Sequence, residues 1–183
     1  MKNITNLLIR SLTDNFSLYL AELGFKRDEE ADLYWRELDG FRELVEVQFD
    51  KRQQPKFVVN FGKAPLNGVV DSYGRHLPVG SVRIGNLVVA GRLYRFPFSI
   101  LWFRVYLVFG LRSPDASVKS EVSRLVALFE QVLEWFRTGK VGSNLSISNR
   151  SENEPGARQK SMKERGVWPP DNWTEEDERA LHM

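Results

Sequence analysis

The chain has 183 residues, of which 42% are hydrophobic and 27% are charged, and its formal net charge is +2. This composition is typical of one soluble globular domain and argues against wholesale disorder or a membrane class, while so small a charge identifies no polyanionic partner. The absence of cysteine excludes disulfides, thiolate metal sites and cysteine nucleophiles together.

The first residues predict no targeting segment. The stretch MKNITNLLIRSL holds one lysine and a short apolar run broken by Arg10, which is too interrupted for the core of a signal peptide. The most apolar run, residues 96–110, is shorter than the ~18 residues of a spanning helix and contains Arg104. We therefore expect a cytoplasmic protein in which this run is a buried strand.

Residues 2–23 predict an amphipathic helix. Apolar residues recur there at helical spacing and form one stripe: Ile4, Leu8, Leu12, Phe16, Tyr19, Leu20 and Leu23. Gly24 follows the stripe, where a glycine in the left-handed conformation commonly ends a helix. We interpret Gly24 as a structural residue.

The next segments predict an antiparallel meander. LYWREL (33–38) and FRELVEVQF (41–49) flank Asp39-Gly40, a pair that tolerates the positive φ angles of a tight hairpin turn. In the second strand the odd-numbered residues are mostly apolar and the even-numbered ones mostly polar, which predicts one buried face. A third strand, KFVVNFG (56–62), repeats this alternation.

Residues 63–80 are rich in Gly, Pro and Asn and predict an irregular loop long enough to carry function. Strands are expected to resume at 81–89 and at 100–109. In the second of these, Trp102, Arg104 and Tyr106 alternate with apolar residues and should share the face opposite the core. Because aromatic residues and arginine are common anchors of protein interfaces, this strip is a candidate protein-binding surface.

Residues 113–138 give the strongest helix signal. Ser113 suits the N-cap, Pro114 the first turn and Gly139 the C-terminal end. The apolar residues at helical period are Val118, Val122, Leu125, Val126, Phe129, Val132, Leu133 and Phe136. The predicted fold class is α+β: an N-terminal helix, a mainly antiparallel β-sheet of about five strands, and a long C-terminal helix packed on the sheet.

After residue 140 the composition shifts to Ser, Asn, Glu, Arg and Pro, which predicts a single domain at 1–139 followed by a polar, partly disordered tail at 140–183. Thr174 and Asp177 resemble a helix N-cap with an acid at the third position. Trp168 and Trp173 are unusual in so polar a segment. Either they pin the tail onto its own domain, or they form a motif for another protein.

These motifs resemble a bacterial family of domains of unknown function. The matching positions are 23–26 (Leu-Gly-Phe-Lys at a helix end), 34–35 in an aromatic strand, 60–62 (a strand ending in Asn-x-Gly) and Trp102. The resemblance covers residues 1–139 and implies no activity. Small domains of this type often stand beside toxin genes, so it implies an immunity-like or accessory role in a bacterial conflict system.

The polar residues predict no metal or cofactor. Asp71, Ser72 and His76 in VDSYGRH are of the types used in a catalytic triad, but the sequence lacks the sharp turn that would activate the serine, and an ordinary surface turn is the simpler interpretation. Asn60 is interpreted as a turn amide. Asp71, His76 and Asn60 would form a site only if they converged in one pocket. Paired histidines for zinc and the glycine spacing of a phosphate loop are both missing from the sequence.

The stretch GRLYRF interleaves Arg92 and Arg95 with Tyr94 and Phe96. This pattern suits a platform for single-stranded nucleic acid. It also suits a strand edge that arginine protects from pairing with other chains, which is the interpretation we favour.

The predicted function is therefore a non-enzymatic protein-binding domain. Its candidate binding residues are Trp102, Arg104, Tyr106, Trp168 and Trp173. The alternative is a small enzyme or a nucleic-acid-binding protein that uses the 63–80 loop.

Overall fold

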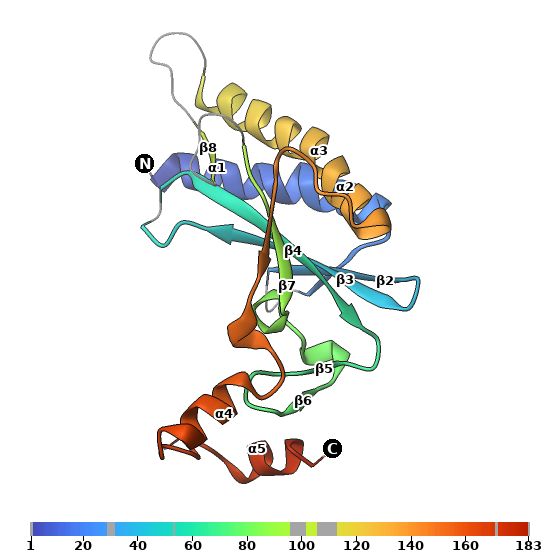
Figure 1. Cartoon of the computed structure of the whole chain (residues 1–183). Coiled ribbons are helices and arrows are strands. Elements are labelled where there is room, and N and C mark those ends of the chain that lie inside the picture. Colours follow the sequence, from blue (N-terminus) through green and yellow to red (C-terminus); the bar gives the residue numbers. More distant parts are fainter. Residues whose placement is uncertain are drawn as a thin grey trace. The chain divides into compact units, whose positions relative to one another are not determined.

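The structure is a computed structural model, and it describes residues 2–28, 32–52, 54–95, 102–105, 113–170 and 172–182 (Figure 1). The helices are α1 (Lys2–Ser11), α2 (Leu18–Glu22), α3 (Pro114–Thr138), α4 (Ala157–Glu164) and α5 (Glu175–Ala180), with the shorter helical turns η1 (Leu12–Ser17), η2 (Val79–Ser81), η3 (Ile84–Asn86) and η4 (Ser151–Asn153). The strands are β1 (Lys26–Asp28), β2 (Leu33–Leu38), β3 (Phe41–Phe49), β4 (Lys56–Pro65), β5 (Val69–Val70), β6 (His76–Leu77), β7 (Val89–Leu93), β8 (Phe103–Arg104) and β9 (Leu145–Asn149). No helix within these ranges combines the length and the apolar character that crossing a membrane requires.

One seven-stranded sheet dominates the described structure. Its order is β1-β2-β3-β4-β7-β9, and β8 pairs antiparallel with β4, whereas β5 and β6 form a separate antiparallel pair. The turn between β2 and β3 has positive φ at both Asp39 (51°) and Gly40 (80°), as the Asp-Gly pair predicted. The predicted α+β class is confirmed, with more strands than the sequence indicated.

The chain divides into two units whose segments alternate along the sequence. Unit 1 comprises Met1–Arg36, Val45–Phe61 and Gly91–Ile147, and unit 2 comprises Glu37–Leu44, Gly62–Ala90 and Ser148–Met183. Residues 140–183, where the composition predicted a partly disordered tail, carry β9, η4, α4 and α5. β9 pairs with β7 in the sheet, and next to this pair the Tyr94 N–H donates to the Asn144 carbonyl at 3.0 Å. Independent folding of residues 1–139 stays a prediction.

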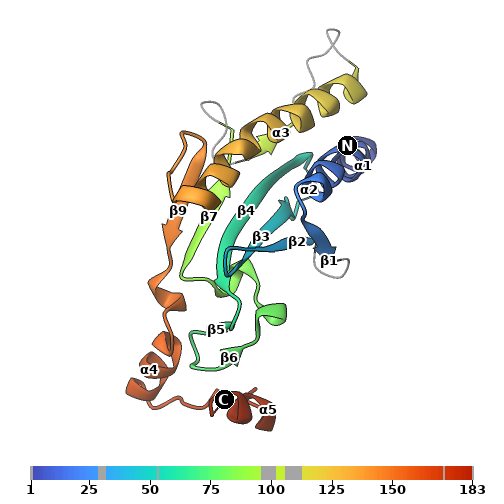
Figure 2. The same cartoon turned by 90° about the vertical axis from the view of Figure 1, so that its right-hand side faces the viewer.

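The hydrophobic core of unit 1 lies between the helices and one face of the sheet. Figure 2 shows α1, α2 and α3 along that face. The predicted helical stripes supply Leu8, Phe16 and Leu20 from one helix and Phe129 from the other, all with no exposed surface. The Phe16 and Phe129 rings meet edge to face, with centroids 5.3 Å apart. The helix predicted with Ser113 as its N-cap and Gly139 at its end is confirmed. The odd-numbered face of β3 contributes Val45 and Val47 to the same core.

The ends of the helices follow their sequence signals. Gly24 has φ +84°, and the Phe25 N–H donates to the Leu20 carbonyl at 2.9 Å, which closes the helix in a Schellman turn. Ser113 accepts a hydrogen bond from the Ala116 N–H at 3.2 Å. The helix predicted over 2–23 is not uniform, because Leu12–Ser17 is π-helical.

Unit 2 contains the segment 62–90. Two short strands lie in the predicted loop at 63–80. The strand predicted over 81–89 is wrong, since helical turns occupy residues 81 and 84–86 and β7 begins only at Val89. Local hydrogen bonding explains the difference: the Arg83 N–H donates to Asn86 Oδ1 at 2.8 Å and favours a turn over a sheet ladder. Leu87 is buried close to Gly62, where an added Cβ would lie 2.4 Å from Leu87 Cδ1, so a larger residue at this position would require the Leu87 side chain to shift.

Candidate functional site

The loop Asp71–Arg75 in unit 2 is organised by one buried carboxylate. Asp71 Oδ1 accepts hydrogen bonds from the backbone N–H groups of Tyr73 (2.9 Å) and Arg75 (3.0 Å). Asp71 Oδ2 accepts from Arg75 Nε at 2.9 Å and from Arg75 Nη2 at 2.6 Å. Gly74 takes the positive φ (89°) that lets the chain reverse between these donors. Asp71 therefore fixes both the turn and the position of the guanidinium group.

Arg75 is held between two carboxylates. Its Nη1 donates to Asp177 Oδ1, so a residue of α5 contacts the loop. Burial lowers the pKa of Arg75, but the hydrogen bonds and charges of Asp71 and Asp177 outweigh that effect and raise the pKa above its ordinary value. The guanidinium group is therefore a permanent cation in this site.

Three aromatic rings gather beside this arginine. The Trp168 and Trp173 ring centroids are 4.6 Å apart, and the centroid of Tyr73 lies 6.5 Å from Trp168 and 6.1 Å from Trp173. All three side chains are half-buried. The two tryptophans that stood out in the sequence thus pack against the 63–80 loop of the same chain, as one of the two predicted alternatives required.

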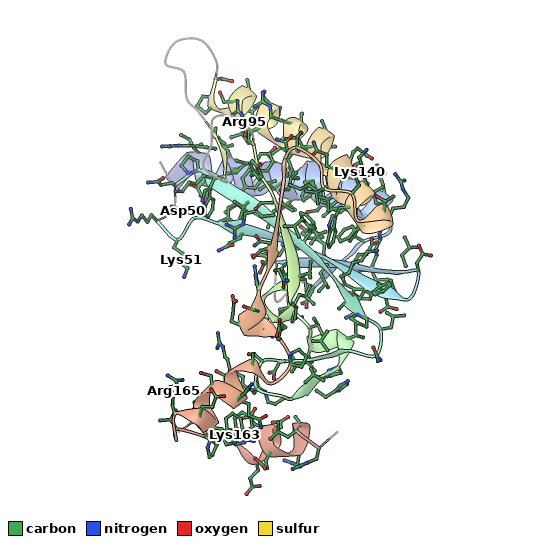
Figure 3. The ribbon with its side chains drawn as sticks, in the orientation of Figure 1. Asp50, Lys51, Arg95, Lys140, Lys163 and Arg165 are labelled. Atoms are coloured by element: carbon green, nitrogen blue, oxygen red, sulfur yellow. The ribbon has the colours of Figure 1, made fainter. Side chains whose placement is uncertain are left out.

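Cationic side chains surround the rings. The Arg75 guanidinium carbon lies 5.2 Å from the Tyr73 ring and 5.6 Å from the Trp173 ring, within the range of cation–π attraction. Lys163, which Figure 3 labels in α4, has its Nζ 5.6 Å from the Trp168 ring. We call Tyr73, Arg75, Trp168 and Trp173 the arginine–aromatic cluster.

A pocket of about 640 Å³ opens beside the cluster, between the loop and α5. Both elements line it with charged and apolar side chains: Arg75, His76, Leu77, Pro78, Ser81, Glu176, Asp177, Arg179 and Ala180. Its volume is in the range of small-ligand sites. Its walls carry both signs of charge, so it suits a polar peptide segment better than a simple anion.

The residues predicted as a possible triad are not arranged as one. Both oxygens of Asp71 are engaged by Arg75 and by backbone N–H groups. The imidazole of His76 pairs through Nε2 with the Asn67 carbonyl at 2.9 Å, and the carbonyl of Ser72 accepts the Arg158 N–H at 2.7 Å. These contacts stabilise the loop, and they place no base beside the Ser72 hydroxyl.

Asn60 lies in unit 1 and forms a different network. It is 5% exposed, donates to Glu46 Oε2 (2.9 Å) and Gln48 Oε1 (3.0 Å), and accepts from Arg92 Nε (3.0 Å). These side chains link three neighbouring strands of the sheet. Asn60 therefore has partners other than Asp71 and His76, and its role in the structure is that of a satisfied buried amide.

The strip on β8 is present as far as the described residues extend. Phe103 and Val105 are buried, Trp102 is half-buried and Arg104 is exposed, which confirms the alternation; Tyr106 lies outside the described residues. Lys56 lies opposite Arg104, its Nζ is 5.0 Å from the Trp102 ring and it pairs with Asp50 at 3.3 Å. This aromatic and basic strip is a second candidate surface, in unit 1.

The arginines of GRLYRF are committed within unit 1. Arg92 donates to Asn60, and Arg95 Nη1 contacts Glu121 Oε2 at 3.2 Å (Arg95 is labelled in Figure 3), while Phe96 lies outside the described residues. Glu121 is buried in α3 and also receives Arg124 Nη1 at 3.0 Å. Burial raises the pKa of Glu121, and the two arginines oppose that rise. This arrangement supports a structural ion cluster rather than a nucleic-acid platform.

The part of the chain that the structure describes holds no group of three or more His, Cys, Asp or Glu side chains placed to bind a metal ion.

The sequence had signalled Trp168, Trp173 and Asp71 but not Tyr73 or Arg75. The signal available for Arg75 was the spacing in Asp71-Ser-Tyr-Gly-Arg75, which suits an Asx turn closed by an arginine.

Comparisons with protein-family models, curated proteins and solved structures found no match to this chain.

Proposed function

We propose that this protein is a protein-binding module and that a partner protein docks on the arginine–aromatic cluster of unit 2. One observation carries the proposal: Tyr73, Arg75, Trp168 and Trp173 pack together yet are only half-buried, beside an open pocket of about 640 Å³. Tyr, Trp and Arg dominate the energetics of protein interfaces, because they offer large contact areas together with hydrogen-bonding groups.

The charges around the pocket favour a protein over a nucleic acid. Asp71 and Asp177 flank Arg75, and Glu176 lines the same pocket. A phosphate backbone needs several cations along its length, and Arg75 is already paired with Asp71 and Asp177, whereas a peptide can offer an aromatic ring together with a few charges to such walls. The alternative of an enzyme that uses the 63–80 loop is supported less, since the hydrogen bonds of Asp71, Ser72 and His76 are those of a structural turn.

The strip of Trp102, Arg104 and Lys56 is proposed as a second docking surface. It combines an aromatic ring with two cations on the face opposite Phe103. Trp102→Ala with Arg104→Glu is the variant that tests this strip separately. An immunity-like partner remains part of the proposal, and the product of the gene beside this one is the first candidate to co-express.

The test is capture with the full chain as bait, followed by binary binding of the identified protein in purified form. Tyr73→Ala should reduce capture of the partner at least about tenfold, as expected for removal of an interface hot spot. Val70→Ala is the matched control, because it removes a 40%-exposed apolar side chain from the same loop. Equal capture by wild type and Tyr73→Ala, with both proteins folded, would contradict the proposal.

A further inference from the structure

The segment that contacts the cluster from the C-terminal side is strongly acidic. Glu175, Glu176, Asp177 and Glu178 follow one another in the first turn of α5, and Asp177 carries the contact to Arg75. The wall that faces this segment supplies the permanent cation of Arg75 and the Tyr73 ring. The acidic helix α5 and the preceding Trp173 therefore already contact Arg75 and Tyr73.

This acidic segment holds its own shape. The Thr174 N–H donates to Asp177 Oδ2 (2.9 Å), and the Asp177 N–H donates to Thr174 Oγ1 (3.2 Å), which forms a capping box. Trp173 Nε1 donates to Glu178 Oε2 at 2.9 Å. None of the residues of α5 is buried. The segment can thus leave the loop without losing the bonds that shape it.

The preceding segment is attached in a different way. Main-chain hydrogen bonds tie it to the loop, from the Gly156 N–H to the Asp71 carbonyl (3.0 Å) and from the Arg158 N–H to the Ser72 carbonyl (2.7 Å). The described contacts of α5 and Trp173 with the loop are made by side chains, at Arg75 and Tyr73. Gly166, with φ 69°, lies between these two kinds of attachment and ends α4.

The contact between α5 and the loop borders an open pocket. The pocket of about 640 Å³ is lined by Arg75 to Pro78 on one side and by Glu176 to Ala180 on the other. This pocket is open to solvent, so the loop and α5 meet around a solvent-accessible space and do not form a closed, densely packed core there. The structure therefore combines charge complementarity with a contact that water can reach.

We propose that residues 172–182 are a displaceable internal ligand, and that the external ligand is an acidic peptide segment of a partner protein with an aromatic residue beside its acids. This inference rests on the proposed function and names the kind of ligand that binds the docking surface. The partner segment takes the place of Trp173 and Asp177 at Tyr73 and Arg75. Because the internal segment is tethered, its effective concentration is on the order of 1 mM, so it suppresses weak competitors until a matching segment arrives.

The experiment uses the full chain and a fluorescein-labelled synthetic peptide with the sequence of residues 172–182, followed by fluorescence anisotropy. Trp173→Ala with Asp177→Asn releases the internal segment and should bind this peptide at least about tenfold more tightly than wild type, because the tethered competitor is lost. Val167→Ala with Glu164→Gln is the matched control, since it makes the same kinds of change at exposed positions in the same region. The control should bind like wild type.

Two further arms identify the site and the chemistry. Adding Tyr73→Ala to the release variant should abolish the gain. A peptide with glutamine at the four acidic positions should bind at least about tenfold more weakly, and the affinity for the acidic peptide should fall as salt rises, because the ion pair with Arg75 is screened.

Three results would overturn the inference. One is a folded release variant that binds the acidic peptide no more tightly than wild type. Another is equal binding of the glutamine peptide, and the third is tighter binding of a labelled single-stranded oligonucleotide than of the peptide. None of these results bears on the proposed function, which is judged by the effect of Tyr73→Ala on the captured partner.

Discussion

Gly24→Ala isolates the energetic cost of a left-handed backbone position. Gly24 has φ +84°, and a Cβ added there meets no atom within 4 Å, so the substitution introduces strain and no clash. A left-handed conformation costs an L-residue about 1–2 kcal/mol. Alanine also lowers the conformational entropy of the unfolded chain, which raises the free energy of unfolding by about 0.4–1 kcal/mol. The net loss in the free energy of unfolding should therefore be about 1 kcal/mol.

Gly85→Ala provides the matched control. Gly85 is also open on all sides within 4 Å, but it lies in the helical turn η3 and lacks a positive φ. The unfolded-state contribution is the same in both variants, so the difference between them should equal the left-handed strain, about 1–2 kcal/mol. Gly24→Asn should lie between Gly24→Ala and wild type, because asparagine tolerates this conformation better.

Urea unfolding, followed by tryptophan fluorescence and by circular dichroism, measures these free energies. The slope of the transition should stay constant across the variants, which shows that only stability has changed. If Gly24→Ala is as stable as Gly85→Ala, the Schellman turn after α2 does not constrain this residue, and the reasoning fails.

Three more predictions test other contacts. Gly91→Ala should cost roughly 1–3 kcal/mol, because its Cβ would lie 2.1 Å from the buried Phe61 ring; an unchanged thermal midpoint would show that the ring can move. Asn60→Leu should cost about 1–3 kcal/mol in urea, since it removes the acceptor of Arg92 Nε and the donors to its two strand neighbours, and a neutral result would mean that water replaces them. Hydrogen bonds from the Thr174 backbone and side chain, and then the contact with Arg75, hold the pKa of Asp177 below its ordinary value of 3.8. The carboxylate therefore contributes stability to α5 that is fully present above the ordinary pKa and is lost as pH falls through the lowered pKa. The protection factors of the α5 amides, each taken relative to the intrinsic exchange rate at the same pH, should stay constant from neutral pH to about pH 4 and fall only below it. Asp177→Asn should lower these protection factors already at neutral pH; unchanged protection in that variant would refute the role of the carboxylate.

The sequence predicted those elements whose signals are local. Ser113, Gly139 and the helical period between them define α3, and Asp39-Gly40 defines the hairpin, because each needs only neighbouring residues to take its shape. The strand predicted at 81–89 failed since the Arg83–Asn86 turn competes with the sheet, a choice that apolar content alone does not reveal. The partner of β9 in the sheet is β7, a strand some fifty residues earlier, and composition does not reveal a partner so distant in sequence.

In the candidate site, too, local sequence signals could be recognised, whereas contacts between distant residues could not. Trp168 and Trp173 could be singled out because bulky rings are rare in a polar segment. Their neighbour Arg75 could not, since its second carboxylate, Asp177, lies 102 residues away in sequence. Asn60 and His76 looked like potential functional groups, and their hydrogen bonds in the structure are those of buried scaffold and loop support.

The alternation of the two units affects the order in which the chain can fold during synthesis. Unit 1 is incomplete until residue 147 has been made, and the ring of Phe16 waits for Phe129, more than a hundred residues later. At ribosomal speeds of roughly 5–20 residues per second, the apolar stripe of α1 and α2 emerges several seconds or more before the helix that covers it. We expect nascent-chain chaperones to bind this stripe during that interval, so that the amount of protein a cell obtains depends on them as well as on the stability of the finished fold.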